Sequence, residues 1–172
     1  MFNVKYSNNI RSLGLVCAFL LMAVMHIYSQ SPAKTIPSFT FKKLDKTEFT
    51  NRNLQAGKFS FFVFFDTECD HCQHAIQYIN QHYRQFKKTA IYLITLDSAA
   101  KVKPFMNKYG ISLKDKKNVV VLQDTRDEFI KKFGPRKYPS LFLYSEKKEL
   151  ILYEDNEQNL YKFIQLINAS DK

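Results

Sequence analysis

Two cysteines separated by two residues are the part of the sequence with the clearest chemistry. Cys69 and Cys72 enclose Asp70 and His71. A pair with this spacing can exchange disulfides, form a structural bridge or supply half of a zinc site. A bridge that closes so short a loop removes only about 2 kcal/mol of unfolded-state entropy, so it would add little stability. We interpret the pair as redox-active and keep a structural disulfide and a metal half-site as alternatives.

The zinc alternative depends on the two nearby histidines, His71 and His74. At about 100° per residue on a helix, His71 lies roughly 200° and His74 roughly 140° from Cys69, so both imidazoles point away from that thiol. No second Cys/His pair follows downstream. We therefore expect neither a metal nor another cofactor.

A strand and a helix are predicted on either side of the pair. Residues 59–65 are a continuous apolar run, typical of a strand buried on both faces. Apolar residues then recur at helical spacing and predict a helix over 70–88. At the start of a helix, unpaired N–H groups and the helix dipole favour the thiolate of Cys69. We expect both sulfur atoms to share this exposed helix tip.

The rest of the chain alternates between strand and helix patterns. The predicted elements are a hairpin at 38–42 and 47–49, a turn or irregular helix at 51–56, a strand at 90–96, a helix at 99–109, a strand at 119–123, a helix from Asp124 or Thr125 to Phe133, strands at 141–145 and 149–154, and a helix at 157–168. This order predicts an α/β fold, with a mixed central sheet and helices on both faces.

The N-terminus reads as an export signal. Two basic residues precede an almost entirely apolar stretch over 12–28, and small residues follow it. We expect a signal peptide over 1–29, cut after Ser29, with Ser31 and Ala33 as alternative cleavage sites. An uncleaved anchor formed by 12–28 in the inner membrane is the other interpretation. Residues 30–172 then form one extracytoplasmic domain, periplasmic or secreted, which contacts a membrane only if the leader is retained.

The cysteine count and the net charge narrow the range of functions. Beyond the leader, only the close Cys69/Cys72 pair remains, whereas exported proteins stabilised by disulfides usually carry several bridges. The net charge is +10. The lysines are nevertheless scattered, and no compact basic cluster with interleaved aromatic residues occurs, so we expect no nucleic-acid partner.

A strand, a Cys-x-x-Cys pair at a helix start and Pro139 before a strand, hairpin and helix together resemble the thioredoxin superfamily. Residues 64–69, Phe-Phe-Asp-Thr-Glu-Cys, are similar to the Phe-Trp-Ala-Thr-Trp-Cys run of extracytoplasmic reductases of the TlpA and ResA kind. The long interval between Cys69 and Pro139 leaves room for the central strand-helix insertion of these proteins. The resemblance implies a thioredoxin-like fold with that insertion and an N-terminal β-hairpin.

The resemblance also implies a function. It indicates a thiol-disulfide oxidoreductase that reduces disulfides of exported proteins and is itself reduced again by a membrane or periplasmic electron donor. An oxidising, DsbA-like enzyme and a non-catalytic thioredoxin-like binding module are the alternatives. A peroxide-reducing peroxiredoxin is disfavoured, because its Pro-x-x-x-Thr-x-x-Cys segment is replaced by Phe62 and Asp66 at the proline and threonine positions.

The resemblance assigns a role to individual residues. These are Cys69 as nucleophile, Cys72 as resolving cysteine, Pro139 as the cis-proline of a substrate loop, Phe65 and Tyr138 as substrate-binding residues, and Glu68, Asp70 and His71 as modulators of the thiols. The buried acidic residues of thioredoxin and ResA would fall at Val63 and Ala75, and neither is acidic. Proton transfer at Cys72 is therefore left to water, Glu68 or a histidine.

Overall fold

The apolar run that precedes the cysteine pair forms the central strand β3 (Phe59–Phe64). In the computed structural model, which describes residues 31–169, β3 pairs in parallel with β4 (Thr89–Thr95) and antiparallel with β6 (Ser140–Tyr144). Side chains from all three strands are buried on both faces of the sheet, which explains why none of them shows polar and apolar alternation in the sequence.

Four further strands complete a mixed seven-stranded sheet. They are β1 (Thr40–Lys43), β2 (Glu48–Thr50), β5 (Val119–Gln123) and β7 (Leu150–Glu154). The strand order is β2-β1-β5-β4-β3-β6-β7. Only the β3–β4 and β4–β5 pairs are parallel, and β1 and β2 form the expected N-terminal hairpin. The predicted mixed sheet is therefore confirmed.

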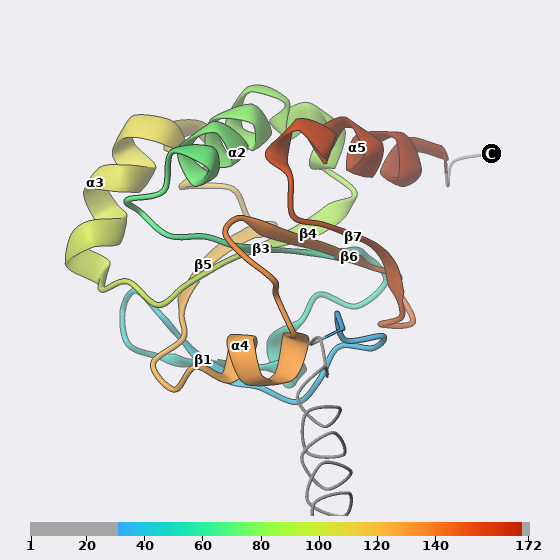
Figure 1. The fold of residues 1–172 in the computed structure, drawn as a ribbon, viewed down its shortest axis with the longest axis horizontal. Coiled ribbons are helices and arrows are strands. Elements are labelled where there is room, and N and C mark those ends of the chain that lie inside the picture. The colour runs from blue at the N-terminus through green and yellow to red at the C-terminus, as the bar shows by residue number, and fades with distance from the viewer. Residues whose placement is uncertain (1–30, 170–172) are drawn as a thin grey trace, which may run out of the picture. The chain divides into compact units, whose positions relative to one another are not determined.

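Helices cover both faces of this sheet (Figure 1). One face carries α2 (Asp70–Gln81), α3 (Ala99–Tyr109) and α5 (Leu160–Ala169), and the opposite face carries α4 (Glu128–Phe133). Short 3₁₀ helices are η1 (Asn51–Asn53), η2 (Tyr83–Phe86), η3 (Ile111–Leu113) and η4 (Glu157–Asn159). The central insertion expected from the resemblance corresponds to α3 and β5.

The alternation of side chains along β3 divides the core into two clusters. Phe61, Val63 and the following Phe65 pack on the α2 side, whereas Phe62 and Phe64 pack on the α4 side. Since successive residues of a strand point to opposite faces, the end of β3 contributes one aromatic ring to each cluster. This arrangement determines what lies on either side of the cysteine pair.

Three predicted helix boundaries differ from the structure. The helix predicted over 157–168 is divided into η4 and α5, and α5 begins only at Leu160. The helix predicted over 70–88 ends at Gln81 and is followed by η2, which places Phe86 in a stack on Phe61 with ring centroids 5.5 Å apart. The helix predicted from Asp124 or Thr125 begins only at Glu128. Asp124 instead accepts hydrogen bonds from the main-chain N–H groups of Arg126 (3.0 Å) and Phe129 (2.7 Å), so its side chain organises the turn before α4.

The first described residues are fixed to the domain by main-chain hydrogen bonds. The N–H of Ala33 donates to the carbonyl oxygen of Phe133 (2.9 Å), and the Tyr144 hydroxyl donates to the Ala33 carbonyl (3.0 Å). Next to them, Leu150 donates to the carbonyl of Lys34 (2.8 Å). The predicted leader, residues 1–29, lies outside the described residues. Within residues 31–169, no helix has the length and apolar character needed to span a membrane.

Candidate active site

Cys69 occupies the N-cap of α2, at the end of the loop that follows β3. Its backbone is extended, and its carbonyl oxygen accepts hydrogen bonds from the N–H groups of Cys72 and Gln73, both at 3.0 Å. The N–H groups of Asp70 and His71 have no hydrogen-bond partner among residues 31–169. The half-buried Cys69 thiol therefore lies at the positive end of the helix, as its position in the sequence predicts.

Cys72 has no exposed surface, so the expectation that both sulfur atoms share an exposed tip is wrong. The reason is its position on the inner face of α2, where Ala75, Ile76 and Ile79 pack on the sheet. The Cys72 sulfur accepts a hydrogen bond from the N–H of Asp66 at 3.5 Å. Only Cys69 is open to a partner, and Cys72 lies directly beneath it.

Burial is the main reason why the pKa of Cys72 lies far above that of an ordinary thiol. A hydrogen bond with the neighbouring Cys69 thiol and the negative charges of Cys69 and Asp66 raise this pKa further, while the Asp66 N–H opposes them. Both cysteines are free thiols in this structure. Cys72 is therefore held as a neutral thiol until a base removes its proton.

Two aspartates accept hydrogen bonds from the loop between β3 and Cys69, and the sequence analysis did not assign a role to either of them. Asp97 follows β4 and accepts hydrogen bonds from the N–H (2.9 Å) and the hydroxyl (2.7 Å) of Thr67. Asp66 accepts one from the N–H of Glu68 (2.7 Å). Parallel strands end at the same sheet edge, so residues that follow β3 and β4 meet there. Their positions directly after two predicted strands were the signal that could have identified them.

The three predicted modulators lie at the rim, and two of them have partners of their own. The Glu68 carboxylate is 2.7 Å from the ammonium of Lys101, and the Glu68 side chain is 76 % exposed. His71 Nδ1 is 2.8 Å from Glu157 Oε1, and Asp70 is exposed in the first turn of α2. Burial raises the pKa of Glu157, but the hydrogen bond with His71, a main-chain hydrogen bond and the charges of His71 and His74 together keep that pKa below its ordinary value.

These contacts change which group is expected to accept the proton of Cys72. Water, Glu68 or a histidine was expected to serve, but Glu68 faces Lys101 and His71 faces Glu157. Asp66 is the carboxylate whose charge acts on the Cys72 thiol, and its own N–H touches the sulfur. Asp66 thus brings a negative charge close to Cys72, although it lies at neither Val63 nor Ala75, the positions of the buried acidic residues in thioredoxin and ResA.

The loop before β6 forms the opposite wall of the site. The Tyr138–Pro139 peptide bond is cis, as the resemblance implied. Ser140, which pairs in register with Phe64 at the end of β3, donates its hydroxyl hydrogen to the Lys137 carbonyl at 2.7 Å. Neither main-chain polar group of Tyr138 has a hydrogen-bond partner among the described residues. The loop therefore presents unpaired backbone beside the cysteines.

Tyr138 links the cysteine side of this loop to the α4 side. Its ring contacts both core clusters and lies 4.7 Å from the Phe64 ring, centroid to centroid. Burial raises the pKa of the Tyr138 phenol to about 12, and the charges of Asp66, Asp97 and Cys72 contribute in the same direction. The hydroxyl therefore remains protonated near neutral pH.

Phe65 does not lie on the rim where a substrate-binding residue was expected. Its ring is fully buried and stacks on Phe105 of α3, with centroids 5.2 Å apart. The cause is the alternation of β3, which carries on into Phe65 and turns this side chain into the α2-side core. Phe65 supports α3 from within, and Phe64 lies closer to the substrate loop.

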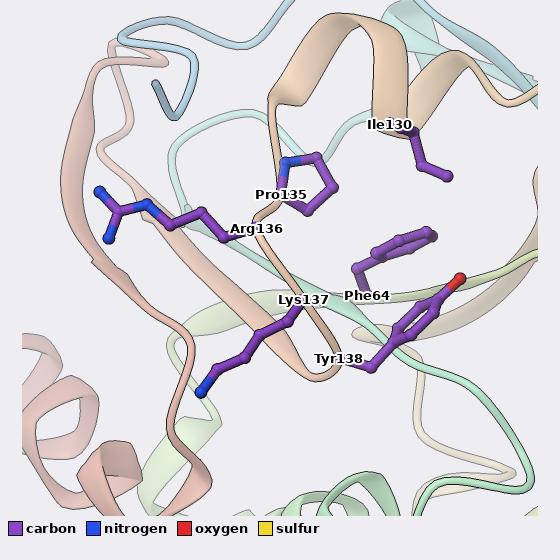
Figure 2. Close-up of a pocket in the computed structure, with 6 residues that line it drawn as sticks. All are labelled: Phe64, Ile130, Pro135, Arg136, Lys137 and Tyr138. Atoms are coloured by element: carbon purple, nitrogen blue, oxygen red, sulfur yellow. The ribbon is translucent and has the colours of Figure 1, made fainter. Parts of the chain in front are cut away.

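A small pocket opens on the α4 side of the loop. Figure 2 shows the Tyr138 and Phe64 rings side by side, with Ile130 of α4 facing them and Pro135 on the loop. The stems of Arg136 and Lys137 complete the lining, while their charged ends point away from the two rings. We call this cavity of about 190 Å³ the loop pocket. It is mostly apolar and adjoins the unpaired backbone of Tyr138.

Comparison with known proteins identifies the family. The model of the AhpC/TSA family matches residues 32–152, so the chain belongs to this family and is a TlpA/ResA-like member of the thioredoxin superfamily. A curated relative, "Thiol-disulfide oxidoreductase ResA" of Bacillus thuringiensis (strain Al Hakam), is 26 % identical over 78 % of this chain and 77 % of its own length. The residues of β3, the cysteine pair and the Pro139 loop all lie within the family match.

Solved structures show the same fold. The thioredoxin domain of a thiol-disulfide oxidoreductase from Bacteroides vulgatus aligns with a TM-score of 0.63 at 18 % identity, over 79 % of this chain and 96 % of that one. A thiol peroxidase from Chromobacterium violaceum aligns with a TM-score of 0.65 at 14 % identity, over 83 % and 88 %. These likenesses establish the thioredoxin-like fold, and the cysteine pair must carry the argument about function.

Proposed function

We propose that this protein is a thiol-disulfide oxidoreductase that reduces disulfides of exported proteins through a Cys69/Cys72 cycle. The observation that carries the proposal is the placement of a half-exposed Cys69 at a helix N-terminus, directly above a buried, neutral Cys72. The curated relatives named as thiol-disulfide oxidoreductases support the same class of reaction.

The reaction begins at Cys69. Its thiolate attacks one sulfur of the partner disulfide, so that a bond forms between Cys69 and that sulfur while the partner's own bond breaks. The displaced partner sulfur leaves as a thiolate and takes up a proton. The helix N-terminus stabilises the attacking thiolate, and Cys72 remains protonated during this step because it is buried.

Cys72 then resolves the mixed disulfide. Loss of its proton to Asp66, or to water held there, gives a thiolate that attacks the Cys69 sulfur. The Cys69–Cys72 disulfide forms, and the partner's second sulfur leaves as a thiolate and is protonated. Two electrons have moved from this protein to the partner, so a membrane or periplasmic dithiol donor must reduce the pair before the next cycle.

The substrate would dock on the loop that contains Pro139. An extended segment can add to unpaired backbone as an extra strand, and the free N–H and C=O of Tyr138 offer such an edge. Pro139 is buried beneath this edge and positions it beside the cysteine pair. These residues would hold the partner disulfide over Cys69.

Reduction of insulin-type disulfides tests the reaction, and a reduction potential tests its direction. We expect turnover with the wild type and none with Cys69→Ser. A potential near that of thioredoxin, about −270 mV, agrees with a reductase, whereas one near −120 mV indicates an oxidising enzyme. Equal inactivity of the wild type and the variant would identify a thioredoxin-like binding module instead.

We also propose that residues 1–29 are an export leader and that the domain works outside the cytoplasm. The apolar stretch over 12–28 and the small residues after it support this proposal. Mass spectrometry of the protein isolated from its cell envelope measures the mature N-terminus. A start at Gln30 agrees with cleavage after Ser29, while an intact N-terminus in the membrane fraction indicates an anchor.

A further inference from the structure

We propose that the loop pocket binds a large apolar side chain located directly beside the reacting cysteine of an extended substrate, and that an acidic residue beyond it is favoured. This inference rests on the proposed function and defines the class of substrate. It draws on three observations: the unpaired backbone of Tyr138, the position and size of the pocket, and the charges of the loop.

The first observation fixes which substrate residue faces the pocket. A strand that pairs with Tyr138 alternates its side chains between the two faces of the sheet. Its cysteine must face the α2 side, because Cys69 begins α2. Both neighbours of that cysteine then face the α4 side, where Phe64 and Ile130 line the pocket. A residue directly beside the cysteine therefore reaches the pocket.

The size and lining of the pocket suit one large apolar side chain. A cavity of roughly 150 Å³ lined by apolar side chains can hold a benzene ring, and this pocket measures about 190 Å³. The Tyr138 hydroxyl has no hydrogen-bond partner among residues 31–169 and remains protonated near neutral pH. It supplies one donor in an otherwise apolar pocket, as is usual for small binding sites.

The loop also carries an excess of positive charge. Arg136 and Lys137 are 57 % and 62 % exposed, and they share a single carboxylate, that of Asp155, at 4.0 Å and 3.9 Å. Their charged ends point away from the pocket rings (Figure 2). An acidic side chain on the other face of the bound strand, next to the residue in the pocket and two residues from the cysteine, would meet this charge.

Rates for matched disulfide peptides test the proposal in the wild type. The peptides differ only at two places: beside the cysteine, with Phe or Ala on either side, and two residues from the cysteine, with Asp or Lys. We expect kcat/KM to be about tenfold higher for Phe than for Ala, in at least one of the two flanking positions. Asp should exceed Lys by about threefold in low salt and lose this advantage at 1 M salt. Equal rates for Phe and Ala would overturn the proposal.

A substitution in the loop pocket tests whether this pocket causes the preference for Phe over Ala. Ile130→Asn should reduce the Phe-to-Ala ratio towards one, because it places an amide in the apolar wall. Ile151→Asn on β7 is the matched control, since it makes the same change at a half-exposed isoleucine outside the pocket, and it should keep the ratio. Thermal unfolding of both variants checks that they fold. An unchanged ratio in a folded Ile130→Asn protein contradicts the proposal. If that variant does not fold, the peptide series with the wild type is the deciding test.

Binding without chemistry separates this inference from the proposed function. Fluorescent peptides with serine in place of cysteine are titrated against the wild type and Ile130→Asn. Tighter binding of the Phe peptide, lost in the variant, supports the pocket even if the protein reduces no disulfide, and the proposed function alone then fails. If disulfides are reduced but Phe and Ala peptides bind equally, the pocket proposal is overturned and the reductase stands.

Discussion

The two cysteines of the pair lie one helical turn apart in two contrasting environments. Cys69 is half-buried at the N-cap of α2, next to main-chain N–H groups without partners. Cys72 is fully buried among apolar side chains and near the Asp66 carboxylate, and its pKa is raised. The difference teaches that position along one helix face can assign the two chemical roles: residues i and i+3 share a face, but Cys69 lies at the open N-cap, whereas Cys72 lies inside the first turn, where α2 packs on the sheet.

The largest expected effect comes from removing one thiol at a time. In the proposed cycle, Cys72→Ser still attacks through Cys69 but cannot resolve, so it accumulates a mixed disulfide with the substrate. Cys69→Ser leaves only the buried thiol and should form none. Non-reducing mass spectrometry after incubation with a disulfide peptide measures the adduct. Comparable adducts in both variants would show that the environments of the two thiols do not assign the roles.

The second prediction concerns the proton of Cys72. Asp66→Asn removes the proposed acceptor while keeping an oxygen for the Glu68 N–H, so we expect resolution at neutral pH to slow by about tenfold to a hundredfold. The rate should then rise about tenfold per pH unit, as hydroxide takes over. Stopped-flow measurement of mixed-disulfide decay against pH reports both effects. Asp70→Asn, at an exposed aspartate in the first turn of α2, is the control and should behave like the wild type.

The third prediction uses stability. The pKa of Cys72 is higher in the folded than in the unfolded protein, so its contribution to stability is complete below the unfolded pKa of about 8.5 and is lost as pH rises above it. The free energy of unfolding of the reduced wild type should therefore fall above pH 9 by up to about 1.4 kcal/mol per pH unit more than that of Cys72→Ala. Urea unfolding at pH 7 to 10 measures this difference. Parallel pH profiles would indicate that the Cys72 thiol is not held neutral by burial.

The smallest effect is expected at the rim. Glu68 and Lys101 are both largely exposed, so solvent screens their ion pair. Glu68→Gln should shift the melting temperature by less than about 2 °C and the alkylation rate of Cys69 by less than about threefold. Differential scanning fluorimetry and iodoacetamide kinetics test this expectation. A tenfold change in alkylation would show that Glu68 controls the reactivity of Cys69.

The sequence was sufficient for the fold because its signals were local and repeated. The apolar run of β3, the helical spacing after Cys72 and the strand patterns near the C-terminus each defined an element, and the mixed sheet with helices on both faces followed from their alternation. The helix boundaries were less accurate at α2 and α4, where side chains decide the ends. Asp124 bonds forward to Phe129, and a residue pattern does not reveal that contact.

The cysteine pair and the Pro139 loop were predicted, but the residues that support them were not. Cys69 and the Pro139 loop lie where the motif and the resemblance placed them. Phe65 was misplaced because the resemblance put its ring on the rim, whereas the alternation of β3 continues into this residue, whose N–H still donates to the Ile94 carbonyl (2.9 Å), and buries the ring. Asp97 was missed because its contact with Thr67 joins segments that are distant along the chain, whereas the contacts of Asp66 with Glu68 and Cys72 are local and depend on the fold of the loop after β3.

The hydrogen bonds of Ala33 distinguish among the proposed cleavage sites of the leader. A peptidase cut after Ser29 leaves intact both bonds of Ala33, to the end of α4 and to the Tyr144 hydroxyl. A cut after Ala33 would separate this residue from the chain and release the two bonds that secure the start of the domain. Cleavage after Ser29 or after Ser31 would keep both bonds, so of the three candidate sites only the one after Ala33 would weaken the start of the domain.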